Sequence, residues 1–133
     1  MKSVHVSGKR KTAIARATAT QGTGKVTVNN VPVELITPDL SRDRVQEPVI
    51  IAGIHAKKVD INVAVTGGGI SAQSDAARLA IAKALVAYTK NKSLEETFLD
   101  YDRQLLVADI RRKEVHKPNR HGKARAKVQK SYR

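Results

Sequence analysis

The first part of the chain alternates between apolar and polar positions with the period of a β-strand. Polar residues flank Val4 and Val6, and residues 11–20 place four alanines on one side. Because side chains on a strand point to opposite faces in turn, both segments are predicted to be strands with one buried face. Residues 21–24 have the composition of a turn and residues 25–28 alternate again. This pattern predicts a hairpin between residues 11–20 and residues 25–28.

The next third of the chain predicts a helix followed by a strand. The sequence Thr-Pro-Asp at residues 37–39 predicts a helix start, with threonine as the N-cap and proline as the first helical residue. Pro48 is predicted to interrupt or restart this helix, and Gly53 to close it. Residues 59–66 carry the clearest strand pattern in the sequence, and three glycines end it.

The pattern then changes to helical spacing. From residue 71 to about residue 90, apolar residues recur every three or four positions, which predicts a helix with one buried side. A Ser-x-x-Glu capping box at residues 93–96 predicts one more short helix, with Phe98 and Tyr101 as core anchors. Residues 105–110 form the last apolar segment, and the hydrophobic pattern stops there.

Charge divides the chain into three parts. The 133 residues carry 25 Lys and Arg against 12 Asp and Glu, a formal net charge of +13. Residues 1–16 carry +5 without an acidic residue, residues 17–110 carry −1, and residues 111–133 carry +9. Because blocks of like charge repel one another and are typical of interaction arms, the sequence predicts two parts. These are a globular body over residues 1–110 and an extended basic tail over residues 111–133.

The positive charge indicates a polyanionic partner, and the composition narrows the choice to nucleic acid. The chain has no apolar run of about 18 residues that could span a bilayer. Pro118 and Gly122 disfavour an amphipathic membrane helix. Aromatic residues make up 3% of the chain, which leaves no stacking platform for bases. Phosphate contacts and shape are therefore expected to dominate, which fits structured RNA better than sequence-specific DNA.

Residues 66–71, TGGGIS, are a candidate phosphate-binding loop because glycines before a helix let a backbone approach an anion. Ile70 stands where a P-loop has lysine, which argues against a P-loop. Residues 69–73 also approach the nucleophile elbow Gly-x-Ser-x-Gly of hydrolases, but the last glycine of that motif is absent. A tightly packed connection, with Ser71 as a helix cap, is therefore favoured. A small-molecule phosphotransferase stays open as an alternative, and so does a DNA-coating protein with a basic tail.

Glu114, His116 and His121 are the candidate metal ligands of the tail. The ten basic residues of the same segment would repel a cation, and the chain has no cysteine to supply a thiolate. These histidines are instead expected to stack on bases or to meet phosphates. The sequence predicts no metal site and no cofactor.

Three stretches together resemble the small-subunit ribosomal protein nine family. They are GKRKTAIARA at residues 8–17, TGGGISAQSDAARLAIAKAL at residues 66–85 and RRKEVHKPNRHGKARAKVQKSYR at residues 111–133. They occur in the family's order along nearly the whole chain. The ending is similar to the archaeal and eukaryotic branch. Bacterial members typically end in a Lys-Arg pair, whereas this chain has Tyr132 in the penultimate position.

The resemblance implies an α+β fold like the second domain of ribosomal protein five. That fold has a mixed four-stranded sheet with helices on one face and a left-handed βαβ crossover, whereas pattern alone favours the right hand. The resemblance also implies a non-enzymatic, cytoplasmic, ribosome-bound protein of the small-subunit head. Its implied partners are small-subunit ribosomal RNA, peptidyl-site tRNA and neighbouring head proteins, with no membrane and no small-molecule substrate.

The resemblance also assigns roles to the basic residues. The tail is expected to reach the peptidyl site and to touch the anticodon stem-loop of the bound tRNA. The residues expected at the tRNA are Lys130, Ser131, Tyr132 and Arg133. The residues expected at ribosomal RNA are Lys9, Arg10, Lys11, Arg16, Arg111, Arg112, Lys113, Lys117, Arg120, Lys123, Arg125 and Lys127.

Overall fold

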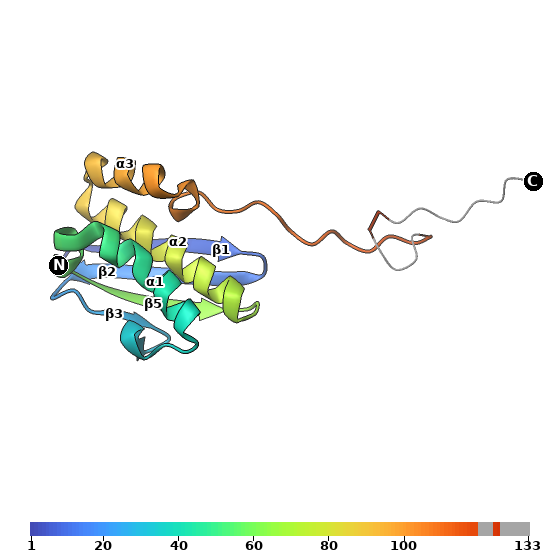
Figure 1. The fold of residues 1–133 in the computed structure, drawn as a ribbon, viewed down its shortest axis with the longest axis horizontal. Helices are drawn as coiled ribbons and strands as arrows, with labels where there is room; N and C mark the ends of the chain where they lie inside the picture. Colours follow the sequence, from blue (N-terminus) through green and yellow to red (C-terminus); the bar gives the residue numbers. More distant parts are fainter. Residues whose placement is uncertain (120–123, 126–133) are drawn as a thin grey trace, which may run out of the picture.

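The structure, a computed structural model, describes residues 1–119 together with residues 124 and 125. Within these residues, one mixed sheet has the strand order β1-β2-β5-β3-β4. Figure 1 labels the first four strands of this order, β1, β2, β5 and β3. The β3 and β5 strands are parallel, and the other neighbouring pairs are antiparallel. The strands are β1 (Ser3–Arg10), β2 (Ala13–Gln21), β3 (Val26–Val28), β4 (Val31–Pro32) and β5 (Val59–Thr66).

Three α-helices and three short 3₁₀ helices complete the described part of the chain. The α-helices are α1 (Asp39–Ala52), α2 (Ile70–Thr89) and α3 (Lys92–Tyr101). The 3₁₀ helices are η1 (Val33–Leu35), η2 (Gly53–Lys58) and η3 (Arg103–Leu105). None of the helices seen in the described residues is long and apolar enough to cross a membrane.

The predicted hairpin between residues 11–20 and residues 25–28 is wrong. The β2 strand pairs with β1 on one side and with β5 on the other, so β3 lies beyond β5. The four alternate apolar residues of β5 are all buried. A central position in the sheet covers such an apolar strand better than an edge position, so β5 lies between β2 and β3. A distant segment therefore separates two strands that are neighbours in the sequence.

The implied four-stranded sheet is also wrong, because β4 adds a fifth strand. It contains two residues and pairs with β3 across a turn formed by Asn29 and Asn30. Both asparagines have positive φ, 50° and 66°, as the two central residues of a type I′ hairpin turn require. A strand of two residues is too short to produce an alternating pattern.

The prediction that helices cover one face of the sheet is confirmed. The four alternate alanines of β2 and the four apolar residues of β5 are buried, and α2 packs on β1, β2 and β5 (Figure 1). Ile81 and Leu85 of α2 are fully buried against this face, with Phe98 of α3 beside them in the same core. Tyr101, the second predicted anchor, is 60% exposed, so that prediction is wrong.

The α1 helix begins one residue later than predicted and is continuous. Pro38 precedes it as the N-cap, so Thr37 makes no cap and Pro38 is not helical. Pro48 lies buried inside the helix without interrupting it. Gly53 closes the helix with a φ of 54°, as predicted. Because α1 lies in the chain between the parallel strands β3 and β5, these elements form a βαβ unit, whose hand stays a prediction.

The caps of α2 and α3 differ from those predicted. Gly69 is the N-cap of α2, which places Ser71 inside the first turn rather than before it. Asn91 caps α3, because its Oδ1 accepts a 3.0 Å hydrogen bond from the Ser93 backbone N–H. Ser93 is thus a helical residue and not the first member of a capping box. In both helices the correct type of element was predicted, with an error of one or two residues in its start.

Candidate nucleic-acid interface

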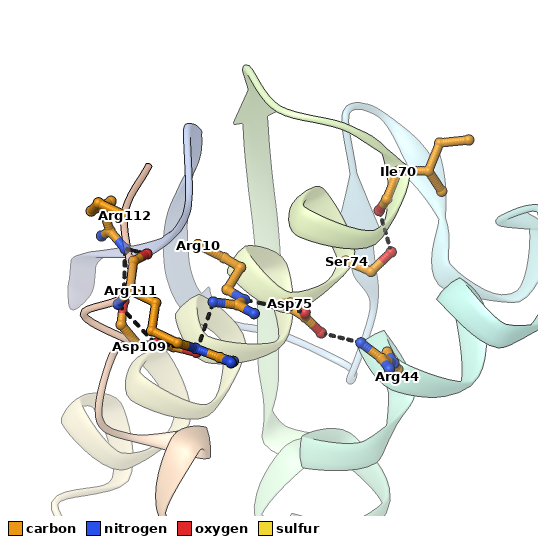
Figure 2. A network of polar contacts seen from close by, with 8 residues as sticks. All are labelled: Arg10, Arg44, Ile70, Ser74, Asp75, Asp109, Arg111 and Arg112. Atoms are coloured by element: carbon orange, nitrogen blue, oxygen red, sulfur yellow. Dashed lines mark hydrogen bonds and ion pairs between the residues drawn. The ribbon is translucent and has the colours of Figure 1, made fainter. Parts of the chain in front are cut away.

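The structure joins the two basic segments of the sequence. Arg10, the last residue of β1, donates a 2.7 Å hydrogen bond from Nη1 to Asp109 Oδ2, 99 residues away (Figure 2). Because Asp109 lies two residues before Arg111, this ion pair fastens the start of the predicted tail to the end of β1. The exposed residues Lys9, Lys11, Arg111 and Arg112 therefore lie within three residues of this ion pair along the chain, at one end of the body. These four residues are called the basic corner below.

Asp109 is the group that holds this arrangement. Its carboxylate also accepts hydrogen bonds from the backbone N–H of Arg111 at 2.9 Å and from Arg111 Nη2 at 2.7 Å. The hydrogen bonds from Arg111, reinforced by the charge of Arg10, lower the pKa of Asp109 to about 2. The Asp109 side chain is 8% exposed, whereas that of Arg111 is 75% exposed. The carboxylate is thus ionised and enclosed, and the Arg111 guanidinium still faces solvent.

The ion pairs continue from Arg10 across the helices. Arg10 Nε lies 3.7 Å from Asp75 Oδ2, and Arg44 donates a 2.6 Å hydrogen bond to Asp75 Oδ1 (Figure 2). Arg78 bridges Glu47 and Asp102 in the same region. These groups line a polar groove of about 340 Å³ with equal numbers of opposite charges. They are Lys9, Arg10, Arg44 and Arg78 against Glu47, Asp75, Asp102 and Asp109. The groove therefore offers no net positive charge to an anion.

Arg16 lies on the face of the sheet opposite the helices. It is exposed and stands between Ser7 of β1 and Ala64 of β5 in the strand register. Lys9 follows Ser7 by two residues, so the pleat of β1 places it on the same face. The basic corner thus continues onto this face of the sheet through Lys9 and Arg16.

The first part of the tail is exposed and irregular. Residues 111–117 contain neither helix nor strand, and Lys113 and Lys117 are exposed there. The Glu114 carboxylate accepts hydrogen bonds from Arg125, which lower the pKa of Glu114. The predicted RNA-binding residues Arg120, Lys123 and Lys127 lie outside the described residues, and so do the predicted tRNA-binding residues Lys130, Ser131, Tyr132 and Arg133.

The possible metal ligands of the tail are not brought together where the structure describes them. Glu114 pairs with Arg125, and His121 lies outside the described residues. Across residues 1–119, 124 and 125, no group of three His, Asp or Glu side chains could hold a metal ion.

A second group of lysines was missed by the sequence reasoning. Asp60 Oδ1 accepts hydrogen bonds of 2.7–2.9 Å from three consecutive backbone N–H groups, those of Thr23, Gly24 and Lys25. These bonds lower the pKa of Asp60, that from Lys25 most strongly. Gly22 N–H also donates to the Lys58 carbonyl at 3.1 Å. The exposed side chains of Lys25, Lys57 and Lys58 therefore belong to one edge of the body. The adjacent pair Lys57-Lys58 was the signal available in the sequence.

The glycine run before α2 serves packing, as the sequence reasoning favoured. Gly67 and Gly68 have positive φ, 76° and 66°. A Cβ on Gly67 would lie 2.6 Å from the Thr12 carbonyl oxygen, and one on Gly68 would lie 3.0 Å from Ala13 Cβ. The run thus lets the end of β5 pass closely over the turn between β1 and β2. Ile70, the next residue after the run, has a side chain that is largely exposed.

Comparison with known proteins gives one consistent result. Residues 8–133 match the model of the family described as ribosomal protein S9/S16. The small ribosomal subunit proteins uS9 of Methanococcus maripaludis strains C7 and S2 are each 52% identical to this chain over 134 residues. The protein of that name from Methanococcus vannielii strain SB is also 52% identical. In each case the similarity covers 100% of both chains.

Proposed function

Because the chain belongs to the ribosomal protein S9/S16 family, we propose that it is a structural, non-catalytic protein of the small ribosomal subunit. It binds ribosomal RNA through the basic corner, the exposed Arg16 and the tail. The observation that carries this proposal is the ion pair between Arg10 and Asp109, which makes one cationic surface from two distant segments. The tail then extends this surface away from the body.

The distribution of free and paired cations supports phosphate binding at the basic corner. Arg44 and Arg78 are engaged with carboxylates inside the polar groove, whereas Lys9, Lys11 and Arg112 are exposed. Charges that face solvent can replace the counterions of an RNA backbone at little desolvation cost. The outward face of the Arg111 guanidinium can also donate to phosphate oxygens while its other edge holds Asp109.

Arg10 has a different role in this proposal from the one predicted for it. Its side chain is 18% exposed and is committed to Asp109 and Asp75. It therefore positions the start of the tail and leaves the phosphate contacts to its neighbours Lys9 and Lys11.

The end of the tail contacts peptidyl-site tRNA in this proposal. Residues 126–133 carry Lys127, Lys130 and Arg133 without an acidic residue, which suits the phosphates of an anticodon stem-loop. Ser131 and Tyr132 can add hydroxyl contacts to the same backbone. This assignment comes from the family resemblance and is compatible with a tail that leaves the body at Asp109.

The salt dependence of RNA binding tests the role of the tail. The affinity for small-subunit ribosomal RNA would be measured against salt for the full chain and for a chain ending at Ile110. Each phosphate contact contributes about 0.7–0.9 to the slope of log affinity against log salt, so truncation should flatten the slope greatly. A thermal melt of the truncated chain checks that its body is folded.

A full-length variant with the ten basic tail residues changed to glutamine is the matched control, because it keeps the length and removes the charge. It should flatten the slope as much as truncation does. An unchanged slope in either variant would contradict RNA binding by the tail. A preference for duplex DNA over structured RNA at the same salt would support the DNA-coating alternative instead.

A further inference from the structure

One stretch of this basic protein has the opposite charge. Residues 26–56 contain four acidic residues against two arginines, a net charge of −2 in a chain of +13. The same stretch carries exposed large apolar side chains, among them Leu35 at 68%, Leu40 at 67% and Ile54 at 73%. The exposed surface of such a segment suits RNA poorly, because its carboxylates repel phosphate and its apolar side chains cannot hydrogen-bond to it.

Part of this surface is hollow. An open groove of about 390 Å³ lies between the turn after β3, the η1 segment, α1 and the start of α2. Its apolar lining includes Val28, Val31, Leu35, Ile36, Val65 and Ile70, and no charged residue lines it. The name crossover groove is used for this site below.

Ile70 forms the outer part of the groove. It is 64% exposed, and Figure 2 shows its side chain directed away from the ion-pair network around Asp75. The residue is the first of a 20-residue helix, and the N-terminus of a helix attracts anions. A lysine or arginine at this position would add to the attraction for phosphate. An exposed isoleucine at this position instead favours an apolar contact.

The charged residues close to the groove in the sequence have an acidic excess. Glu34 precedes Leu35, and Asp39 and Asp43 lie two residues to either side of the lining residue Ser41. Arg42 is paired with both aspartates, at 3.2 Å and 3.5 Å. The groove lining also lacks an aromatic ring on which a base could stack. The groove therefore offers RNA neither a cation for its phosphates nor a ring for its bases.

We propose that the crossover groove binds a basic segment of a neighbouring protein. An apolar side chain of that segment would fill the space between Leu35 and Ile70, and flanking Lys or Arg residues would face Glu34, Asp39 and Asp43. The inference rests on the proposed function, because the small ribosomal subunit supplies the partner. It divides the body into an RNA-binding side at the basic corner and a protein-binding side at the crossover groove.

A photo-crosslinking experiment in the assembled subunit tests this inference. A photoreactive amino acid would replace Leu35 in the full chain, and the tagged chain would be incorporated into small subunits. The crosslinked product is expected to be a protein segment rich in Lys and Arg. A product with RNA, or the absence of any product from incorporated chains, would overturn the inference.

Two lysine variants of this photoreactive chain localise the contact. Ile70→Lys places a cation in the groove, so the yield of the protein product should fall by about tenfold. Ile54→Lys is the matched control, because Ile54 is similarly exposed but does not line the groove, and it should leave the yield unchanged. Equal yields from the two variants, or a rise in RNA product with Ile70→Lys, would show that no basic protein segment occupies the groove.

Sedimentation separates this inference from the proposed function. The Ile70→Lys chain should still sediment with the small subunit, because the basic corner and the tail are intact. If it does so without changing the crosslink, the inference alone fails. If the unmodified chain does not enter the subunit, the proposed function fails and the inference fails with it.

Discussion

The carboxylate of Asp109 holds one enclosed cation, Arg10, and one exposed cation, Arg111. It holds Arg10 and Arg111, and it turns Arg10 from a surface cation into an enclosed structural one. The family resemblance implies that both arginines meet RNA, and the sequence alone does not distinguish them because their partners cannot be read from it. Asp109 is the only acidic residue between Arg103 and Lys113, which marks it as a candidate partner. Its actual partner on β1 is 99 residues away and could be found only in the fold.

The titration of Asp109 gives a prediction for the start of the tail. Because the folded pKa of Asp109 is about 2 and its ordinary value is 3.8, the ionised contacts should be complete above pH 4. Their stabilising effect should be lost as the pH falls from about 4 to 2. The measurement is an NMR titration of the Asp109 carboxyl group, read together with hydrogen exchange of the Arg111 amide.

The variant Asp109→Asn should reproduce the low-pH behaviour at pH 7. Exchange of the Arg111 amide should become faster because its acceptor loses its charge, and the melting temperature of the body should change little. The control is Asp100→Asn, since Asp100 is exposed and makes no ion pair among the described residues. Equal exchange in the two variants would mean that Asp109 does not hold the tail.

At the scale of elements, local patterns were predicted well and distant pairings were not. The strand at residues 59–66 and the long helix after it were found because their alternation and their helical spacing are properties of one segment. The partner of β2 was wrong because β5 enters between β2 and β3 from 38 residues further along the chain. The helix caps were misplaced because Asn91 and Ser93 are equally good caps by sequence, and the backbone selects one of them.

The contact between α2 and β1 depends on a residue without a side chain. A Cβ on Gly8 would lie 2.7 Å from the Ala76 carbonyl oxygen and 2.9 Å from the Ala80 backbone nitrogen. Both alanines are fully buried, so the helix can move away only by opening the core. The glycine therefore sets the distance between the helix and the sheet.

The variant Gly8→Ala should lower the free energy of unfolding by about 1–3 kcal/mol, because the added methyl group overpacks the interface. Alanine would also reduce the entropy of the unfolded chain, an effect of about 0.4–1 kcal/mol in the opposite direction. Urea unfolding of the purified chain measures the sum. Ser7→Ala is the control on the exposed side of the same strand and should change stability by less than about 0.5 kcal/mol. A stabilising Gly8→Ala would contradict the close packing.

For the whole molecule, the fold sorts charge into separate regions. The ion pairs of Arg10, Arg44 and Arg78 neutralise the centre of the body, where the helices meet the end of β1. Much of the remaining positive charge lies at the basic corner, on one face of the sheet and along residues 111–133, and Lys25, Lys57 and Lys58 form a second group. The acidic and apolar stretch at residues 26–56 remains for other contacts. Under the two proposals above, this separation would let one small protein bind RNA and a protein at the same time without competition between the two.

The last residues of the tail give a prediction that separates tRNA binding from assembly. Deletion of residues 131–133 removes one arginine, so the slope of ribosomal RNA binding against log salt should change by no more than about 0.9. Small subunits carrying the shortened chain should therefore assemble, but they should retain peptidyl-site tRNA less well. The loss should be modest, because many RNA and protein contacts hold one tRNA.

Lys113→Gln is the matched control, because it removes one charge from the start of the tail. It should affect the salt slope similarly and leave tRNA retention unchanged. Filter binding of tRNA to purified subunits measures retention, and sedimentation measures assembly. If the deletion reduces assembly while the subunits that do form retain tRNA normally, the tail acts in folding the RNA rather than in holding tRNA. Lys113 lies far along the tail from residues 131–133, and this distance makes the two roles separable.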